Sequence, residues 1–258
     1  MSDTVLRERK PLRNVFFDAA MSIMGQLERV IVNTSLVPTT PFLEKDAFPW
    51  SRDLEANWRD IRAELDAVLV YKDDLPAFHT ISGDVTHIKS DDWKTFFFYG
   101  YGFRAEANLA RCPRTAALLS RIPGLTTAFF SILAPGIRIT PHRGPWKGVL
   151  RYHLGLMVPE PRENCAIKID GQVAHWREGE GLLFDDSFEH SVWNDTNGTR
   201  VVLFLDVLRP CRAPGSWINK AVIKAAAGSP FLADARRKHE KWQKTFDAKH
   251  GPESSLRP

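Results

Sequence analysis

Cysteine is scarce in this sequence, and long hydrophobic runs are missing. The 258 residues include three cysteines, Cys112, Cys165 and Cys211, which lie far apart and form no CxxC pair. An odd and sparse set argues against a disulfide framework and favours a reducing compartment. No apolar run reaches the roughly 20 residues that a membrane-spanning helix needs. We also find no internal repeat, low-complexity tract or typical signal peptide, and we therefore expect a cytoplasmic protein.

Charge is unevenly distributed along a chain of otherwise ordinary composition. Hydrophobic residues make up 43% and charged residues 26% of the sequence, which is typical of a folded domain with a full core. The net charge is +4, but residues 209–258 hold eleven Lys and Arg against four Asp and Glu, and residues 1–13 hold four against two. These basic ends predict either an anionic partner, such as a phosphate-bearing lipid, or a solvated basic helix. We expect no nucleic-acid partner.

Helical periodicity marks both ends of the chain and the segment that follows the first of them. Residues 14–32 form an amphipathic pattern, which predicts a helix that docks on the domain or lies in a membrane interface. A proline-containing linker follows. A second helix is predicted over Leu54–Val68, with Ser51 as its N-cap. Further helical patterns lie at Pro113–Arg121 and, after residue 211, in the C-terminal region.

Between Thr126 and Leu208 the pattern changes to short β-rich runs separated by turn residues. The eight predicted strands are Ala128–Leu133, Arg138–Thr140, Val149–Val158, Ala166–Ile169, Val173–Trp176, Leu182–Phe184, Ser191–Trp193 and Arg200–Val207. They predict a mainly β protein with flanking helices, whose core is a double-stranded β-helix, or jelly-roll, cupin-like barrel. We place this jelly-roll domain and its supporting helices at 46–210. An N-terminal helix and linker (1–45) precede it, and a basic helical C-terminal tail (211–258) follows.

Two histidines occupy similar positions in the predicted barrel. His142 follows a strand in the turn Thr140–Pro145, and His190 lies 48 residues later, where a loop enters a strand. Two imidazoles at strand ends of one barrel can converge on a metal, and imidazole suits iron, zinc and copper. A hydrogen-bonded structural role is the alternative, because this spacing alone does not select a metal site.

Arginine side chains are predicted inside the barrel. Strand alternation in Val149–Val158 places Arg151 and His153 on one face, and an apolar row on the other. Arg200 begins the strand that follows His190. A buried guanidinium needs an anion, and its planar fork matches a carboxylate. That anion is either a small dicarboxylate from solution, if the interior holds few carboxylates, or an internal group. The internal candidates are Asp185, Asp186 and Asp206.

Four segments resemble the aspartyl/asparaginyl β-hydroxylase family: Pro141–Pro145, Leu150–Leu156, Phe184–Trp193 and Arg200–Asp206. The resemblance covers residues 130–210 closely. Upstream, the Phe-Pro-Trp segment at residues 48–50 is similar to bacterial members, including the lipid A acyl-chain hydroxylases. The resemblance implies a non-haem Fe(II)- and 2-oxoglutarate-dependent dioxygenase, which uses O2 to hydroxylate an unactivated C–H bond.

The resemblance also implies roles for individual residues. His142 and His190 would ligate Fe(II), and Arg200 would hold the distal carboxylate of 2-oxoglutarate. The residues that complete the cosubstrate pocket are Ser131, Arg151 and His153. Most enzymes of this fold add a carboxylate two residues after the first histidine. Gly144 stands there in this chain, as in the β-hydroxylases proper, so water would take that position.

Asp186 is the candidate for a further catalytic group. It lies four residues before His190, from where it would hydrogen-bond the iron-bound water. A loop cap or a partner for an arginine is the alternative role. The lipid A hydroxylases more often keep an aspartate at the position of Gly144, which counts against a direct assignment to them.

The resemblance leaves several substrates open. A peptide Asp/Asn hydroxylase would bind the substrate carboxylate in a cationic groove. A lipid A acyl-chain hydroxylase would use the N-terminal helix and the basic tail to make peripheral contact with the inner membrane face. A small-molecule hydroxylase fits equally, and a halogenase would place a halide beside Gly144. Outside enzymes, the alternative is a carboxylate-binding jelly-roll module without turnover.

Overall fold

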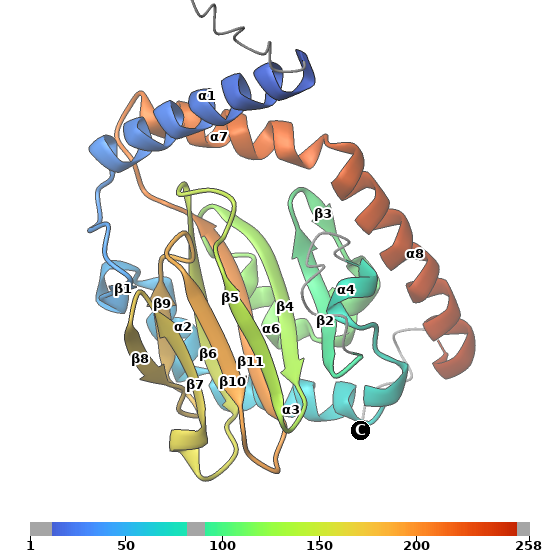
Figure 1. Cartoon of the computed structure of the whole chain (residues 1–258). Coiled ribbons are helices and arrows are strands. Elements are labelled where there is room, and N and C mark those ends of the chain that lie inside the picture. Colours follow the sequence, from blue (N-terminus) through green and yellow to red (C-terminus); the bar gives the residue numbers. More distant parts are fainter. Residues whose placement is uncertain (1–11, 82–90, 252–258) are drawn as a thin grey trace, which may run out of the picture.

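Two antiparallel sheets form the body of the protein, and helices surround them (Figure 1). The computed structural model describes residues 12–81 and 91–251, with side chains described from Ser22 onward. The larger sheet has the strand order β1 (Phe42–Leu43), β9 (Gly181–Phe184), β6 (Val149–Met157), β11 (Arg200–Leu208), β4 (Leu125–Leu133), β2 (Trp93–Gly100) and β3 (Phe103–Arg104). The smaller sheet has the order β5 (Ile137–His142), β10 (His190–Asn194), β7 (Cys165–Ile169) and β8 (Gln172–His175).

The eight predicted strands are all present, and the predicted jelly-roll class is confirmed. Their ends differ from the prediction by no more than three residues. The hairpin between β7 and β8 turns at Asp170 and Gly171, whose φ angles of 48° and 82° are the positive values that a two-residue hairpin turn requires. β1 lies before residue 46, where we placed the start of the domain, and it pairs with β9 at the sheet edge.

Helices flank the sheets on several sides. The α-helices are α1 (Leu12–Thr34), α2 (Trp50–Ala56), α3 (Trp58–Leu69), α4 (Phe78–Ile81), α5 (Glu106–Arg111), α6 (Pro113–Leu119), α7 (Gly215–Ala227) and α8 (Pro230–His250). Short 3-10 turns lie at Lys45–Ala47, Lys72–Asp74 and Arg162–Asn164. The helices predicted at 14–32, 113–121 and in the C-terminal region are therefore present, the last as two helices.

The second predicted helix differs in detail. It is divided into α2 and α3 at Asn57, and its expected N-cap, Ser51, is wrong. α2 already begins at Trp50, directly after Pro49, whose fixed φ suits the start of a helix. The Ser51 hydroxyl is buried and donates to the Lys45 carbonyl at 3.2 Å, so it ties the helix to the preceding turn instead of capping it.

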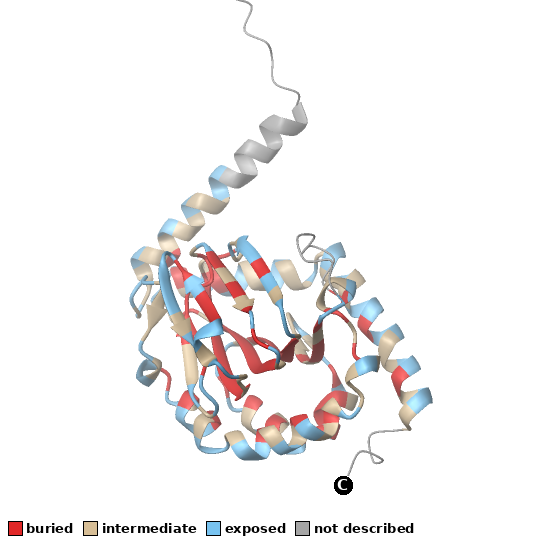
Figure 2. Ribbon diagram, turned by 60° about the horizontal axis from the view of Figure 1, so that its bottom comes forward, coloured by how far each residue is buried: buried red, intermediate tan, exposed pale blue. Residues whose placement is uncertain are grey.

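Strand alternation divides the core into two layers. The outer layer lies between the larger sheet and the helices, and it takes Leu150, Tyr152, Leu154 and Leu156 from β6. The inner layer lies between the two sheets and combines residues of β4, β11, β5, β7 and β10. Figure 2 shows the buried strands enclosed by helices that are exposed on their outer faces. The functional side chains described below belong to the inner layer and its rim.

α1 packs along α7, and the described part of the predicted N-terminal helix docks on the domain. Ile31 is fully buried against Trp146 and Val149, and Leu27 packs on the same cluster. Ile23, closer to the N-terminus, is 57% exposed. Among the described helices none is long and apolar enough to cross a membrane. The basic residues before position 12 lie outside the described residues.

Candidate active site

The structure brings His142 and His190 together. The two strands that carry them, β5 and β10, are neighbours, and their register places His142 directly opposite His190. The ring centroids are 4.1 Å apart. Directly opposed residues in an antiparallel pair have Cβ atoms about 5 Å apart on one face of the sheet, so a single ion can contact both rings. The convergence predicted from the sequence is therefore present, and its metal role stays a prediction.

Both imidazoles are oriented by backbone carbonyl groups. His142 Nδ1 lies 2.8 Å from the Thr140 oxygen, and His190 Nδ1 lies 3.0 Å from the Phe188 oxygen. A neutral ring that donates from Nδ1 carries its lone pair on Nε2, which is the metal-binding tautomer. Burial lowers the pKa of His190 to about 3, with further lowering from Arg151 and His142. This ring is therefore neutral, as a metal ligand must be.

Gly144 lies against the Asp186 side chain. Its N–H donates to the Asp186 backbone oxygen at 2.8 Å, and a Cβ atom at position 144 would come within 2.2 Å of Asp186 Oδ2. The Asp186 carboxylate thus fills the space in which a side chain at position 144 would begin. No group of three or more His, Cys, Asp and Glu side chains suited to a metal occurs within residues 12–81 and 91–251. Within these residues the two histidines remain the candidates for a metal site, and its further ligands stay a prediction.

Arg200 is buried without a carboxylate partner. It begins β11, is 2% exposed, and forms no ion pair with any carboxylate of the described residues. Its nearest polar contact is a long hydrogen bond of 3.4 Å from NH1 to Ser131 Oγ, which also accepts from Trp93 Nε1 at 3.0 Å. The guanidinium lies 4.7 Å from the centre of the Trp176 ring. Burial lowers the pKa of Arg200 to about 10, which still leaves it charged at neutral pH.

Further polar atoms near Arg200 have no partner within the part of the chain that the structure describes. These atoms are Arg200 Nε, Trp176 Nε1 and both ring nitrogens of His153. The His153 ring lies between Trp176 and Phe204, at centroid distances of 6.0 and 5.0 Å. Burial, and then Arg200, lower its pKa well below the usual range. Buried polar groups are normally hydrogen-bonded, so this cluster is suited to an anionic ligand with several acceptor oxygens.

Arg151 contrasts with Arg200, because internal carboxylates balance its charge. Its Nε and NH2 donate to Asp206 at 2.8 and 3.1 Å, and NH2 lies 2.9 Å from Asp186. Asp185 pairs with the buried Arg209 in the same way. The expectation of few carboxylates inside the barrel is therefore wrong, and the alternative of internal pairing holds for Arg151. Asp186 has the role of arginine partner that we weighed for it, while its contact with a metal-bound water stays a prediction.

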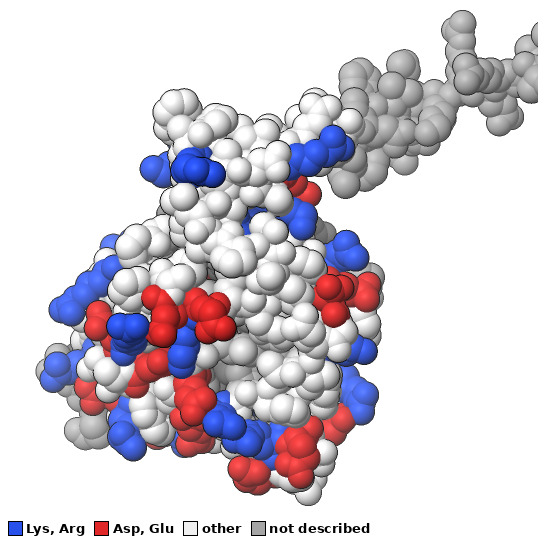
Figure 3. All heavy atoms as spheres, turned by 90° about the vertical axis from the view of Figure 1, so that its left-hand side faces the viewer, with Lys and Arg blue, Asp and Glu red and all other residues white. Residues whose placement is uncertain are grey.

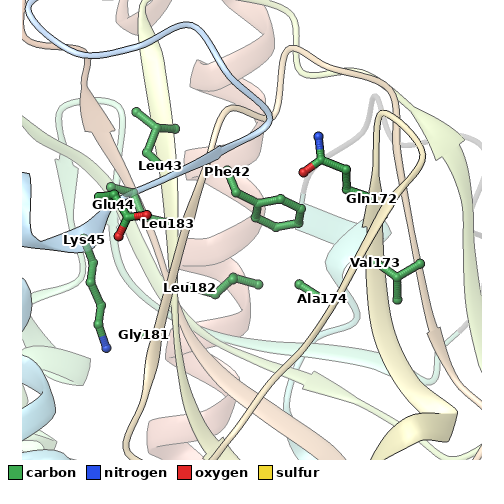
Figure 4. A pocket seen from close by; sticks show the side chains of 10 residues that line it. All are labelled: Phe42, Leu43, Glu44, Lys45, Gln172, Val173, Ala174, Gly181, Leu182 and Leu183. Atoms are coloured by element: carbon green, nitrogen blue, oxygen red, sulfur yellow. The ribbon is translucent and has the colours of Figure 1, made fainter.

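A cavity of about 680 Å³ opens beside this network. Its polar end is lined by His142, Arg151, Asp186 and Asp206, and eight aromatic residues contribute to the rest of its lining. A second cavity, of about 290 Å³, lies between β1, β8 and β9 (Figure 4). None of the predicted site residues lines that second cavity, so the larger one is the candidate substrate site.

Sequence reasoning missed three aromatic residues of the site. Trp93 anchors Ser131, Trp176 lies under Arg200, and Tyr101 lines the large cavity. Tyr101 has a φ angle of 39°, a left-handed conformation that non-glycine residues rarely adopt. The Tyr101-Gly102 pair between two aromatic runs was the available signal for a tight turn there. Burial raises the pKa of the Tyr101 phenol, which therefore stays protonated.

Comparison with known proteins places the chain in a family. The family model for aspartyl/asparaginyl beta-hydroxylase matches residues 55–210, which include the predicted metal and cosubstrate residues but not the residues of α8 that line the large cavity. The chain belongs to the aspartyl/asparaginyl β-hydroxylase family. The resemblance inferred from the four segments is thereby confirmed, and so is hydroxylation of an unactivated C–H bond as the class of reaction.

Two curated relatives illustrate the range of the family. An ornithine lipid ester-linked acyl 2-hydroxylase from Rhizobium tropici is 45% identical over 229 residues, covering 88% of this chain and 82% of that protein. The human aspartyl/asparaginyl beta-hydroxylase is 36% identical over 168 residues, covering 63% of this chain but only 21% of the human protein. The Rhizobium match therefore extends beyond the barrel into the flanking helices.

The comparison with solved structures gives matches at low sequence identity. A cupin domain of a transcriptional regulator from Enterobacter cloacae is 17% identical and covers 47% of this chain and 99% of its own, with a TM-score of 0.30.

Proposed function

We propose that the protein is an Fe(II)- and 2-oxoglutarate-dependent hydroxylase. The observation that supports the proposal is Arg200, a buried guanidinium that forms no ion pair with any carboxylate in residues 12–81 and 91–251. It lies in the barrel that also holds His142 and His190. A buried charge left unpaired costs several kcal/mol. A carboxylate that enters this pocket removes that cost, and the planar fork of Arg200 matches it.

One group of site residues would hold the metal, and another would hold the cosubstrate. His142 and His190 would hold Fe(II) through Nε2, because Nδ1 of each ring faces a backbone carbonyl. Bound Fe(II), with O2 and 2-oxoglutarate, supplies the oxidising chemistry that no side chain has. Arg200 and Ser131 would fix the distal carboxylate of 2-oxoglutarate, while His153 offers buried nitrogen atoms to it. This orientation is set before the substrate arrives.

At the rim, Arg151 and Asp186 have a positioning role. Asp186 reaches the space beside Gly144, where it would accept a hydrogen bond from water at the metal. Arg151 holds Asp186 in that place through the 2.9 Å ion pair. Burial raises the pKa of Asp186, and the adjacent Arg151 guanidinium acts against this shift.

We propose an acyl chain of a membrane lipid as the substrate. The similarity to the Rhizobium tropici acyl 2-hydroxylase, which extends over 88% of the chain, supports it. The large cavity beside His142, to whose lining eight aromatic side chains contribute, also suits an alkyl chain better than a charged peptide.

The protein would reach its substrate from the cytoplasmic side of a membrane as a peripheral protein. On α7, Trp217 is 69% exposed and two lysines, Lys220 and Lys224, are exposed as well. Exposed indole and lysine side chains are typical of helices that lie at an anionic membrane surface. In Figure 3 the upper part of the molecule, around α1 and α7, is mostly uncharged and its few charged groups are mainly Lys and Arg, whereas both signs mix over the body below.

One substrate screen tests the function. The full chain is incubated with Fe(II), ascorbate and 2-oxoglutarate. Parallel reactions also contain an ornithine-lipid extract, Asp- and Asn-containing peptides, or small carboxylic acids. We expect succinate release coupled to the gain of one oxygen atom in the lipid, at the carbon next to the acyl carbonyl. Oxygen gained by peptides instead would transfer the function to the peptide class, and chloride incorporation would make it a halogenase. Absence of succinate with every substrate would contradict the proposal.

A further inference from the structure

The large cavity has two ends of different character. Near His142 its lining is polar and charged. Away from it, the sheet contributes a surface of stacked rings: Phe97 and Phe129 lie 4.6 Å apart, and Phe129 and Phe204 lie 4.2 Å apart, with interplanar angles below 30°. Rings packed in this way present a continuous apolar surface, which suits an alkyl chain and offers few hydrogen-bonding groups.

Helix α8 supplies the opposite wall. Its residues Phe231, Leu232, Ala235, Arg236 and His239 line the cavity. Phe231, Ala235 and His239 are spaced by four residues and therefore lie along one face of the helix. The Arg236 guanidinium pairs with Glu240 at 2.8 Å and lies 5.6 Å from the centre of the Phe103 ring. His239 is buried, and burial lowers its pKa to about 4, so it adds no charge to the wall at neutral pH. α8 begins at residue 230, beyond the family match that ends at residue 210. The metal and cosubstrate residues and this wall therefore come from different parts of the chain.

We propose that α8 is the chain-length gauge of the substrate site, with Ala235 as the residue that limits how far an acyl tail extends. The carbonyl end of the chain lies beside His142, and the tail runs along Phe129 and Phe97 toward α8. This assignment rests on the proposed function and specifies its substrate contacts. A small side chain at position 235 leaves room that a large one would fill, because Ala235 lines the cavity and is half-buried.

Binding of a fluorescent fatty acid to the metal-free full chain tests this assignment without relying on turnover. The probe is cis-parinaric acid, and saturated fatty acids of increasing length compete with it. For wild type we expect affinity to increase about fourfold per methylene until the tail reaches α8, and then to level off. Failure of the probe to bind wild type, or binding that does not depend on chain length, would overturn the proposal.

Substitutions at two positions of α8 test whether Ala235 limits the chain length. Ala235→Trp should level off at a shorter chain and bind the longest competitor at least tenfold more weakly. The matched control is Ala233→Trp, two residues earlier on the exposed side of the same helix, and it should behave as wild type. Ala235→Leu is the milder variant, with a smaller shift in the same direction, should the tryptophan variant fail to fold.

The outcomes separate this proposal from the proposed function. An unchanged chain-length profile in folded Ala235→Trp or Ala235→Leu overturns the gauge, even where the lipid is hydroxylated. The expected binding shifts support the gauge even where no oxygen is transferred, in which case the proposed function fails instead.

Discussion

Two arginines of the barrel, Arg151 on β6 and Arg200 on β11, lie in opposite electrostatic surroundings. Arg151 touches two carboxylates, Asp186 and Asp206, at the edge of the large cavity. Arg200 lies deeper, against Trp176 and Ser131, and meets no carboxylate among the described residues. The two strands are hydrogen-bonded neighbours, and their register places Arg151 opposite Asp206, whereas Arg200 lies at the other end of β11. The difference therefore reflects both the depth of each guanidinium and the side chains around it.

The difference indicates what each arginine is for. A buried charge that is neutralised internally contributes to the folded structure and orients its partners. A buried charge that is left unpaired costs stability, and such a cost is expected where a ligand provides the counter-charge. We therefore assign Arg151 to positioning Asp186, and Arg200 to binding the cosubstrate. This comparison leads to opposite expectations for the same substitution at the two sites.

Replacing Arg151 should give the largest loss of stability. Arg151→Leu leaves Asp186 and Asp206 buried without a counter-ion, which should lower the free energy of unfolding by about 3–5 kcal/mol. Urea denaturation followed by circular dichroism measures it. The double variant Arg151→Leu/Asp206→Leu should regain part of the loss, since one uncompensated charge is removed. An Arg151→Leu variant as stable as wild type would contradict the structural role assigned to Arg151.

The same change at Arg200 should leave stability unchanged or higher, and impair cosubstrate binding. Loss of a charge-assisted contact to the distal carboxylate costs at least about 2 kcal/mol, so KM for 2-oxoglutarate should increase about thirtyfold or more. Arg200→Lys keeps the charge but loses the planar fork, and it should also show a large increase. Initial rates of succinate formation measure both variants. An unchanged KM would remove Arg200 from this role.

A side chain at position 144 should disturb the ion pair between Arg151 and Asp186 by displacing Asp186. A Cβ atom there would overlap Asp186 Oδ2, so Gly144→Ala should destabilise the protein by about 1–3 kcal/mol. Asp186→Ala should relieve this, giving a coupling energy of about 0.5–3 kcal/mol between the two substitutions. A thermal denaturation cycle over the four proteins measures it, and strictly additive effects would show that the two residues do not share the space.

The smallest expected effect is a pH dependence from His239, in the cavity wall. Its folded-state pKa, about 4, lies below the usual value of 6.5, so the unfolded chain binds more protons between these values. Stability contributed by the neutral ring is full above pH 6.5 and decreases as the pH falls toward 4, by at most about 1.4 kcal/mol per pH unit. His239→Phe suits the surrounding rings and should lose that part of the dependence. If the free energy of unfolding depends on pH in the same way in wild type and His239→Phe, this prediction is contradicted.

Local sequence patterns predicted much of the fold. The eight strands follow from alternation and turn residues, and alternation also placed Arg151 and His153 inside the barrel. The division of the second predicted helix at Asn57 was not predictable in this way, because the apolar spacing continues across the break. Such patterns describe one strand or helix at a time. They predict on which face of that element a residue lies, but not which residue of another element it contacts.

The pairing of side chains in the site depends on register, which local patterns do not contain. The register between β6 and β11 places Asp206 opposite Arg151. The register between β5 and β10 places His190 opposite His142. From the sequence, Asp206 was one of three equivalent candidates for an internal partner. Trp176 and Trp93 reach Arg200 and Ser131 from distant segments, and no spacing rule connects them.

The most direct measurement is the response of the arginine side chains to 2-oxoglutarate. Nε–Hε resonances of Arg200 and Arg151, assigned through the leucine variants, are followed by NMR in zinc-loaded protein during a titration. We predict that the Arg200 resonance shifts markedly while that of Arg151 changes little, and that pyruvate, which lacks the distal carboxylate, leaves Arg200 unmoved. A shift of Arg151 with no change at Arg200 would contradict the assignment of the unpaired guanidinium to the cosubstrate.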